Sequence, residues 1–218
     1  MSFKKLAGGA AVASQNSSPR GDKRREALLA ALDEKLRTTS LDDISVSDLT
    51  NSAGITRSAF YFYFDSKAAA VTVLLGSVLE RAEESTTEVV EGEGGFRRRV
   101  ENSLEILADR LVANAHIYRA LLTARMTTES TRELWDEGRA ELAEPIAEHI
   151  RAERAAGRAP EGADPTTLAR ALVQLNESVL EQLVYATSEP PRELLLATAT
   201  DMWVRCVYGR PDPDVDPA

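Results

Sequence analysis

The stretch SVSDLTNSAGITRSAFYFYFDSK, residues 45–67, carries the signals for two short helices joined by a tight turn. Ser45 can cap a first helix in which Asp48 lies three residues later, a variant of the capping box. Gly54 can adopt a positive φ in the turn, and Thr56 can cap a second helix that runs to about Phe64. Two helices connected in this way form the helix-turn-helix unit found in many DNA-binding proteins.

The second helix of this stretch has two contrasting sides. At about 100° per residue, the side expected to face the core carries Ala59, Phe60, Tyr63 and Phe64. The opposite side carries Arg57, Ser58, Tyr61 and Phe62. Two aromatic rings beside an arginine are unfavourable in water unless a partner covers them. The major groove of DNA is such a partner, and the alternative is a protein–protein patch or a fully buried core helix.

The chemistry of the outward side suits double-stranded DNA. Arg57 can donate two hydrogen bonds to guanine O6 and N7, and Phe62 can pack on a thymine methyl group. The hydroxyl groups of Thr56 and Tyr61, with the amides at the helix start, can bind phosphates. Lys67, at the start of the next helix, is expected to reach the same DNA backbone.

Residues 44–49, 53–64 and 66–67 resemble the DNA-binding domain of the TetR family of repressors. Shorter later blocks resemble one branch of that family: Glu133-Leu134-Trp135, Leu175-Asn176-Glu177, and Met202-Trp203-Val204 running to Tyr208-Gly209. The similarity spans about residues 22–209. It implies DNA contacts by Ser47, Thr56, Arg57, Ser58, Tyr61, Phe62, Tyr63 and Lys67.

The motif departs from the family pattern at two places. Ser47 stands where the founding member of the family has an arginine, so one base contact is expected to be absent. Ala68, Ala69 and Ala70 replace the usual acidic start of the following helix.

The remainder of the chain is helical by composition. Alanine, leucine, glutamate and arginine dominate it, and long alternating runs of β-branched residues are absent. The periodicity predicts a first helix after Gly21 and Asp22 and a third one from about 66 to 91. Later helices are expected over about 96–113, 115–126, 129–157, 164–188 and 191–208. We therefore predict an all-α fold of about nine helices, with an N-terminal three-helix helix-turn-helix domain and a C-terminal helical ligand-binding and dimerisation domain.

The predicted organisation has four parts. Residues 1–21 are a flexible leader, 22–67 the DNA-binding domain, 68–209 the effector-binding and dimerisation domain, and 210–218 a disordered tail rich in proline and aspartate. Lys4 and Lys5 before an apolar run give the leader a faint likeness to a secretory signal, but Gly8 and Gly9 interrupt that run.

The chain offers no apolar run of about 20 residues to cross a bilayer. We expect a cytoplasmic protein without a membrane partner.

Charge is distributed unevenly along the chain. The net charge is −9, yet residues 1–67 carry a net +2 and residues 68–218 a net −11. Only the N-terminal part is therefore expected to meet a polyanion such as DNA. The run Lys23-Arg24-Arg25 at the start of the first helix is either a solvated face or a further set of phosphate contacts.

The last two predicted helices carry apolar stripes formed by Leu168, Leu172, Leu175, Val179 and Leu183, then Leu195, Met202 and Val207. In relatives the equivalent pair packs against its twin as a four-helix dimer interface. Such a two-fold homodimer would hold two recognition helices about 34 Å apart on a palindromic operator. Alternatively, the stripes face their own core.

Asn176 lies among apolar residues, so it is either a satisfied core amide or part of a ligand site. The resemblance implies the second, within a narrow apolar tunnel for a small hydrophobic effector molecule. The matching positions are Val100, Leu104, Leu107, Leu111, Trp135, Leu142, Ile146, Asn176, Glu177 and Trp203. Arg139 and Glu181 replace apolar residues of that branch, so the effector can differ. Pro145 is expected to interrupt its helix and to allow a kink.

No pattern in the sequence indicates an enzyme, a metal site or a cofactor. His116 and His149 lack partners at ligand spacing, and the single cysteine, Cys206, has no nearby base and is expected to be a small buried residue. The glycine-rich residues 92–95 lack the ending of a phosphate-binding loop. The predicted function is a ligand-responsive transcriptional repressor, and the alternative is a helical small-molecule-binding or adaptor protein that does not act on DNA.

Overall fold

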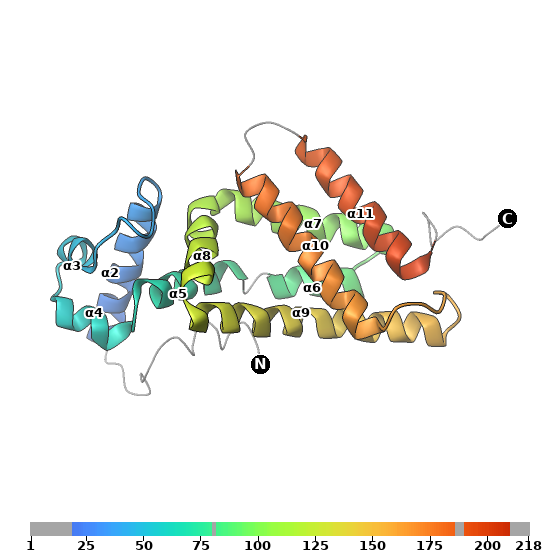
Figure 1. Ribbon diagram of the computed structural model, residues 1–218, viewed down its shortest axis with the longest axis horizontal. Coiled ribbons are helices and arrows are strands. Elements are labelled where there is room, and N and C mark those ends of the chain that lie inside the picture. The colour runs from blue at the N-terminus through green and yellow to red at the C-terminus, as the bar shows by residue number, and fades with distance from the viewer. Residues whose placement is uncertain (1–18, 80–81, 186–189, 210–218) are drawn as a thin grey trace. The chain divides into compact units, whose positions relative to one another are not determined.

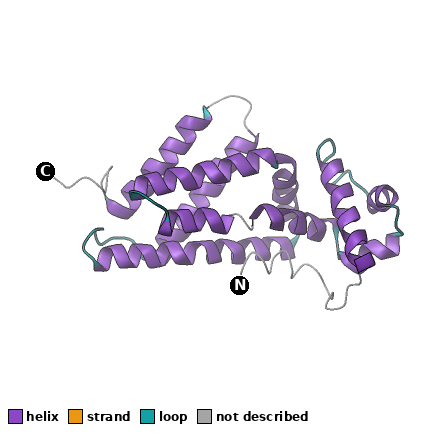
Figure 2. Cartoon of the chain, turned by 180° about the vertical axis from the view of Figure 1, so that it is seen from behind, coloured by secondary structure: helices purple, strands orange, loops and turns teal. Residues whose placement is uncertain are grey.

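The computed structural model describes residues 19–79, 82–185 and 190–209, and each regular element in them is an α-helix (Figures 1 and 2). The helices are α2 (Pro19–Leu36), α3 (Val46–Ala53), α4 (Arg57–Tyr63), α5 (Lys67–Leu79), α6 (Ala82–Glu91), α7 (Phe96–Ala113), α8 (Ala115–Thr127), α9 (Glu129–Ala155), α10 (Pro165–Tyr185) and α11 (Arg192–Tyr208). The predicted all-α class is confirmed. The predicted leader before residue 19 and the predicted tail lie outside the described residues.

One predicted helix limit, the start of the first helix, differs from the observed one. Helix α2 begins at Pro19 rather than after Asp22, because a proline is favourable in the first turn, where its missing N–H is not needed. The single helix expected from 66 to 91 stays a prediction, because residues 80 and 81, between α5 and α6, lie outside the described residues. Helix α9 includes Pro145, in agreement with the single helix predicted over about 129–157.

The chain divides into two compact units. Unit 1 combines residues up to 80 with residues 114–136, so it contains α2, α3, α4, α5, α8 and the first turns of α9. Unit 2 combines residues 81–113 with the chain from 137 onward, and it contains α6, α7, the rest of α9, α10 and α11.

Unit 1 is built around α2, which contacts α3, α5 and α8. Leu28 and Leu32 of α2 are almost completely buried, as is Leu49 of α3. Phe60 of α4 and Phe64 after it are buried too, and their ring centroids lie 5.7 Å apart. Each large apolar side chain removed from water contributes about 1.5–3 kcal/mol, so this cluster holds the short helices α3 and α4 in place.

Unit 2 has α7 at its centre, in contact with α6, α10 and α11. Val100, Leu104 and Ala108 form its buried side. Ion pairs join α7 to α11 at the surface: Arg97 Nη2 lies 2.5 Å from Asp201 Oδ1, and Arg192 Nη2 contacts both Glu105 and Asp109. None of the helices in the described ranges is long and apolar enough to span a membrane.

Candidate nucleic-acid interface

Helix α3 is fixed at both ends by the residues that the sequence indicated. Ser45 Oγ accepts a hydrogen bond from Asp48 N at 3.0 Å, and Ser45 N donates to Asp48 Oδ2 at 3.0 Å. The Ser45 hydroxyl, 2.6 Å from Asp48 Oδ2, and the Ser45 N–H both donate to this carboxylate and lower the pKa of Asp48. Gly54 ends the helix with φ +66°, in the left-handed region that favours glycine. The predicted capping box and turn are confirmed.

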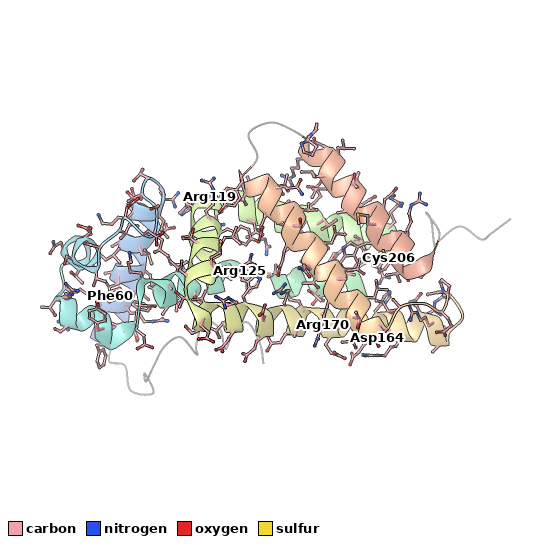
Figure 3. The ribbon with its side chains drawn as sticks, in the orientation of Figure 1. Phe60, Arg119, Arg125, Asp164, Arg170 and Cys206 are labelled. Carbon is pink, nitrogen blue, oxygen red and sulfur yellow. The ribbon has the colours of Figure 1, made fainter. Side chains whose placement is uncertain are left out.

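Helix α4 starts at the predicted cap, Thr56, whose Oγ1 accepts a hydrogen bond from Ala59 N at 3.3 Å. Its two sides differ as the helical wheel predicted. Phe60, labelled in Figure 3, points into the core, whereas Tyr61 and Phe62 are 48% and 69% exposed. Few large apolar side chains of unit 1 are this exposed, so the outer side of α4 is a surface that a partner can cover.

The exposed side chains of α4 are ordered by contacts with one another. The Arg57 guanidinium carbon lies 5.9 Å from the centroid of the Tyr61 ring. Phe62 meets the edge of Tyr63 with ring centroids 5.1 Å apart. Thr56 Oγ1 and Ser58 Oγ are 3.0 Å apart. Among the predicted DNA contacts, Ser47, Thr56, Arg57, Ser58, Tyr61 and Phe62 are exposed, and Tyr63 is half-buried.

Lys67 has a different position from the one expected. Its Nζ donates to the carbonyl oxygens of Leu41 at 2.6 Å, Asp42 at 3.3 Å and Ile44 at 2.5 Å. An ammonium group has three N–H donors, so these carbonyls use its full capacity. The geometry therefore favours a role for Lys67 in fixing the loop before Ser45, rather than the phosphate contact that its place in the motif implies.

The basic start of α2 lies next to the end of α4. The Arg25 guanidinium carbon is 5.8 Å from the centroid of the Phe64 ring, while Lys23 and Arg24 are exposed. No local pattern in the sequence indicates the contact between Arg25 and Phe64. Lys23 and Arg24 are exposed on the same first turns of α2, so this basic run is either a solvated face or a set of phosphate contacts.

The predicted effector residues occur in both units, and each unit is described by itself. In unit 2, Val100, Leu104, Leu111, Ile146 and Trp203 are buried, while Leu107, Leu142, Asn176 and Glu177 are half-buried. Trp203 Nε1 donates to Asn176 Oδ1 at 2.8 Å, which supports the satisfied core amide. Arg139 Nη1 lies 3.6 Å from Glu177 Oε2.

Trp135 is the one predicted effector residue in unit 1. It packs beside two residues that sequence reasoning did not single out: the Tyr118 ring, 6.1 Å away between centroids, and the Arg125 guanidinium carbon, 5.2 Å from the indole centroid. Both residues lie on α8, a helix in which the sequence contains no recognisable motif.

The histidines have hydrogen-bond partners far away in the sequence, and the cysteine differs from its expected burial. His116 Nε2 lies 2.7 Å from Asp33 Oδ1, and His149 Nε2 lies 3.3 Å from the Tyr208 hydroxyl. Cys206, expected to be buried, is exposed on α11, because Trp203 and Val207 take the inward side of that helix. Among the described residues, no group of three or more His, Cys, Asp or Glu side chains could hold a metal ion.

Comparison with known proteins places both parts of the chain. Residues 28–71 match the model of bacterial regulatory proteins of the tetR family, and residues 100–209 match the C-terminal domain of the transcriptional regulator EthR. EthR of Mycobacterium tuberculosis is 33% identical over 201 residues, covering 89% of this chain and 92% of that protein. EthR of Mycolicibacterium smegmatis is 31% identical over 198 residues, covering 89% and 91%.

Solved structures show the same fold at lower sequence identity. NalD of Pseudomonas aeruginosa, described as the secondary repressor of the MexAB-OprM multidrug efflux pump, is 20% identical with a TM-score of 0.65 over 86% of this chain and 98% of that one. A TetR-family transcriptional regulator from Rhodococcus sp. is 22% identical with a TM-score of 0.64, over 82% and 97%. With its helix-turn-helix, its second helical unit and relatives of this identity and coverage, the chain belongs to the TetR family of bacterial transcriptional regulators and is not an enzyme.

Proposed function

We propose that this regulator is a homodimeric repressor that leaves a palindromic operator when a small apolar effector binds. The observation that carries the DNA-binding part is the exposed pair Tyr61 and Phe62 beside Arg57 on α4. Regulators of this family bind DNA operators and small-molecule effectors, typically as dimers. Access to DNA also supports the cytoplasmic location expected from the sequence.

Each exposed side chain of α4 has a role in this proposal. Arg57 reads a guanine and Phe62 covers a thymine methyl group. Tyr61, Thr56 and the amides at the start of α4 bind phosphates. Ser47, Ser58 and Tyr63 are the further contacts in this proposal, and Lys67 fixes the loop that precedes α3.

A single arginine substitution tests the reading role of α4. Arg57→Ala should weaken binding to the DNA upstream of the regulator's own gene by about 10- to 100-fold, because a bidentate arginine–guanine pair contributes about 1–3 kcal/mol. Fluorescence anisotropy with labelled DNA measures this change. Arg132→Ala, at another exposed arginine of unit 1, is the matched control and should bind as the unsubstituted protein does. Equal affinities for both variants would move the reading surface away from α4.

The exposed faces of α10 and α11 support a dimer through these helices. On α11, Leu194, Thr198, Met202 and Cys206 recur every four residues and are all exposed. On α10 the same spacing leaves Arg170, Gln174, Ser178 and Gln182 exposed (Arg170 and Cys206 are labelled in Figure 3). Leu172, Val179 and Val207 of the predicted stripes instead face the core of unit 2. The dimer surface is therefore the side of each helix opposite to those buried residues.

The proposed effector is small and mainly apolar, because the side chains at the predicted positions are mainly aliphatic or aromatic. It can release DNA only if it binds the DNA-free conformation more tightly than the DNA-bound one. A thermal-shift screen with lipophilic compounds tests this, since a ligand raises stability according to its concentration relative to its Kd. Hits should also lower the affinity for DNA. A stabilising compound that leaves DNA affinity unchanged would contradict the proposed release.

A further inference from the structure

The indole N–H of Trp135 is a buried hydrogen-bond donor without an acceptor. Trp135 is 9% exposed, and its Nε1 has no hydrogen-bond partner among the described residues. An indole N–H can only donate, and the large majority of buried polar side-chain atoms in proteins have a partner. The other tryptophan of the chain follows that rule, because Trp203 Nε1 donates to Asn176.

The surroundings of Trp135 provide packing but no acceptor. The Arg125 guanidinium lies over the indole ring, and the Tyr118 ring is inclined to it by 46°. Arg125 is on α8, near the end that leads into α9 (Figure 3). A guanidinium has donors only, so it cannot satisfy an N–H. An arriving molecule with an acceptor atom would remove this deficit.

Trp135 belongs to the same compact unit as the recognition helix α4. Helix α8, which carries Tyr118 and Arg125, contacts both α2 and α5. His116 on α8 also binds Asp33 on α2, and Lys67 on α5 binds the loop that precedes α3. A molecule that displaces packing around Trp135 therefore acts on helices that contact the helix-turn-helix within unit 1.

We propose that the effector carries a neutral carbonyl-type oxygen that accepts a hydrogen bond from Trp135 Nε1. This inference rests on the proposed effector response and specifies the chemistry of the ligand. A neutral oxygen fits better than a carboxylate, because burying an anion costs far more unless a cation pairs with it, and the Arg125 guanidinium already packs on the ring face of Trp135. A purely apolar molecule would leave the N–H unsatisfied.

The test compares two probes that differ by one group, butyl phenyl ketone and pentylbenzene. The full-length protein labelled with ¹⁵N-tryptophan gives two indole N–H signals in an NMR spectrum, because the chain has two tryptophans. Trp135→Phe assigns them by removing one. The ketone should shift the Trp135 signal downfield and leave the Trp203 signal, with its Asn176 partner, in place as the internal reference. Pentylbenzene should cause no downfield shift of either signal.

Affinity gives a second readout. The ketone should bind about tenfold more tightly than pentylbenzene, the effect of one hydrogen bond to a buried donor, and Trp135→Phe should abolish that preference. The proposal is overturned if neither probe moves the Trp135 signal, if both move it equally, or if Trp135→Phe keeps the preference. DNA binding without any probe is measured separately, so failure of the repressor proposal is distinguishable from failure at Trp135.

Discussion

At the scale of single residues, the five consecutive aromatic residues from Phe60 to Phe64 show how one short helix serves two purposes. A rotation of about 100° per residue sends Phe60 and Phe64 to the core, and it leaves Tyr61 and Phe62 in solvent. The buried rings hold α4 against unit 1, while the exposed rings remain available to DNA. Core packing and recognition therefore depend on neighbouring residues of one sequence motif.

The exposure of these residues could be predicted because it depends only on helical periodicity. The surroundings of Lys67, Trp135 and Cys206 could not be predicted from the sequence. Lys67 donates hydrogen bonds to carbonyl oxygens more than 20 residues earlier in the chain. Whether the Trp135 N–H finds an acceptor depends on tertiary structure, and among the described residues it finds none. Cys206 differs from expectation because the apolar residues around it fix the inward side of α11. Long-range contacts of this kind leave no local signal.

Lys67 gives a prediction that separates a phosphate contact from a role in fixing the loop. Lys67→Met should weaken DNA binding by a similar factor at every salt concentration, because the loop before Ser45 loses its donor while the number of phosphate contacts stays the same. Urea unfolding should show reduced stability as well. Anisotropy titrations over a range of salt concentrations give the slope of log affinity against log salt.

A phosphate contact by Lys67 would instead reduce the magnitude of that slope by about 0.9. Such a decrease, without loss of stability, would contradict the role assigned here. Lys23→Met is the comparison variant, because Lys23 is exposed, and its loss should flatten the slope if the basic start of α2 binds phosphate.

At the scale of helices, the predicted limits were most accurate where a local signal marks them. Ser45 with Asp48, Gly54 and Thr56 each mark a terminus through a hydrogen bond or a backbone conformation that involves neighbours in sequence. The start of α2 was placed too late, since the periodicity of Leu28 and Leu32 says nothing about the solvated first turns. The helix predicted over about 129–157 is observed as α9, with Pro145 inside it.

The ends of α9 and α11 and the start of α7 meet around His149. Its ring stacks on Phe96 at 5.4 Å between centroids, and its Nε2 faces the Tyr208 hydroxyl, which donates to Glu153 Oε2 at 2.9 Å. Glu153 is also bound by Arg158. Burial lowers the pKa of His149; the nearby Glu153 carboxylate opposes this, while Arg99 and Arg158 add to it. The hydrogen bond from Arg158 holds the pKa of Glu153 below its usual value.

This cluster predicts a loss of stability in mild acid. Because the pKa of His149 is lower in the folded chain than its usual value of 6.5, the unfolded chain binds the proton more readily. The free energy of unfolding should therefore fall as the pH drops below 6.5 toward the lower folded pKa. His149→Phe keeps a ring against Phe96 and should reduce that dependence. Urea unfolding between neutral pH and mild acid, above the range in which Glu153 titrates, measures this pH dependence. Identical pH profiles for His149→Phe and the unsubstituted protein would show that His149 is not its cause.

At the scale of the whole molecule, the sequence predicted a DNA-binding segment followed by a larger helical part, with opposite net charges. It did not predict that α8 and the first turns of α9 share a compact unit with the helix-turn-helix. Residues separated by more than 80 positions, such as Asp33 and His116, make that unit. Composition and periodicity identify helices, but they do not say which distant helices pack together.

The proposed dimer gives a prediction with a closely matched control. Met202 on α11 is 45% exposed and Met126 on α8 is 79% exposed. Met202→Glu places a charge in the proposed interface of two α11 helices, so sedimentation analysis should show monomers and DNA affinity should fall with dimerisation. Met126→Glu adds the same charge at a more exposed methionine and should leave the dimer intact. A dimeric Met202→Glu protein would place the interface elsewhere.

The central claim is that the exposed face of α4 reads DNA from a two-fold dimer. Hydroxyl-radical footprinting on the DNA upstream of the regulator's own gene tests it most directly. We expect two protected half-sites on one face of the duplex, about 10 base pairs apart or a multiple of that spacing, which weaken with added salt. The protection should disappear for the Arg57→Ala, Tyr61→Ala double variant. Absence of any salt-sensitive paired protection, or the same footprint with the double variant, would contradict the claim.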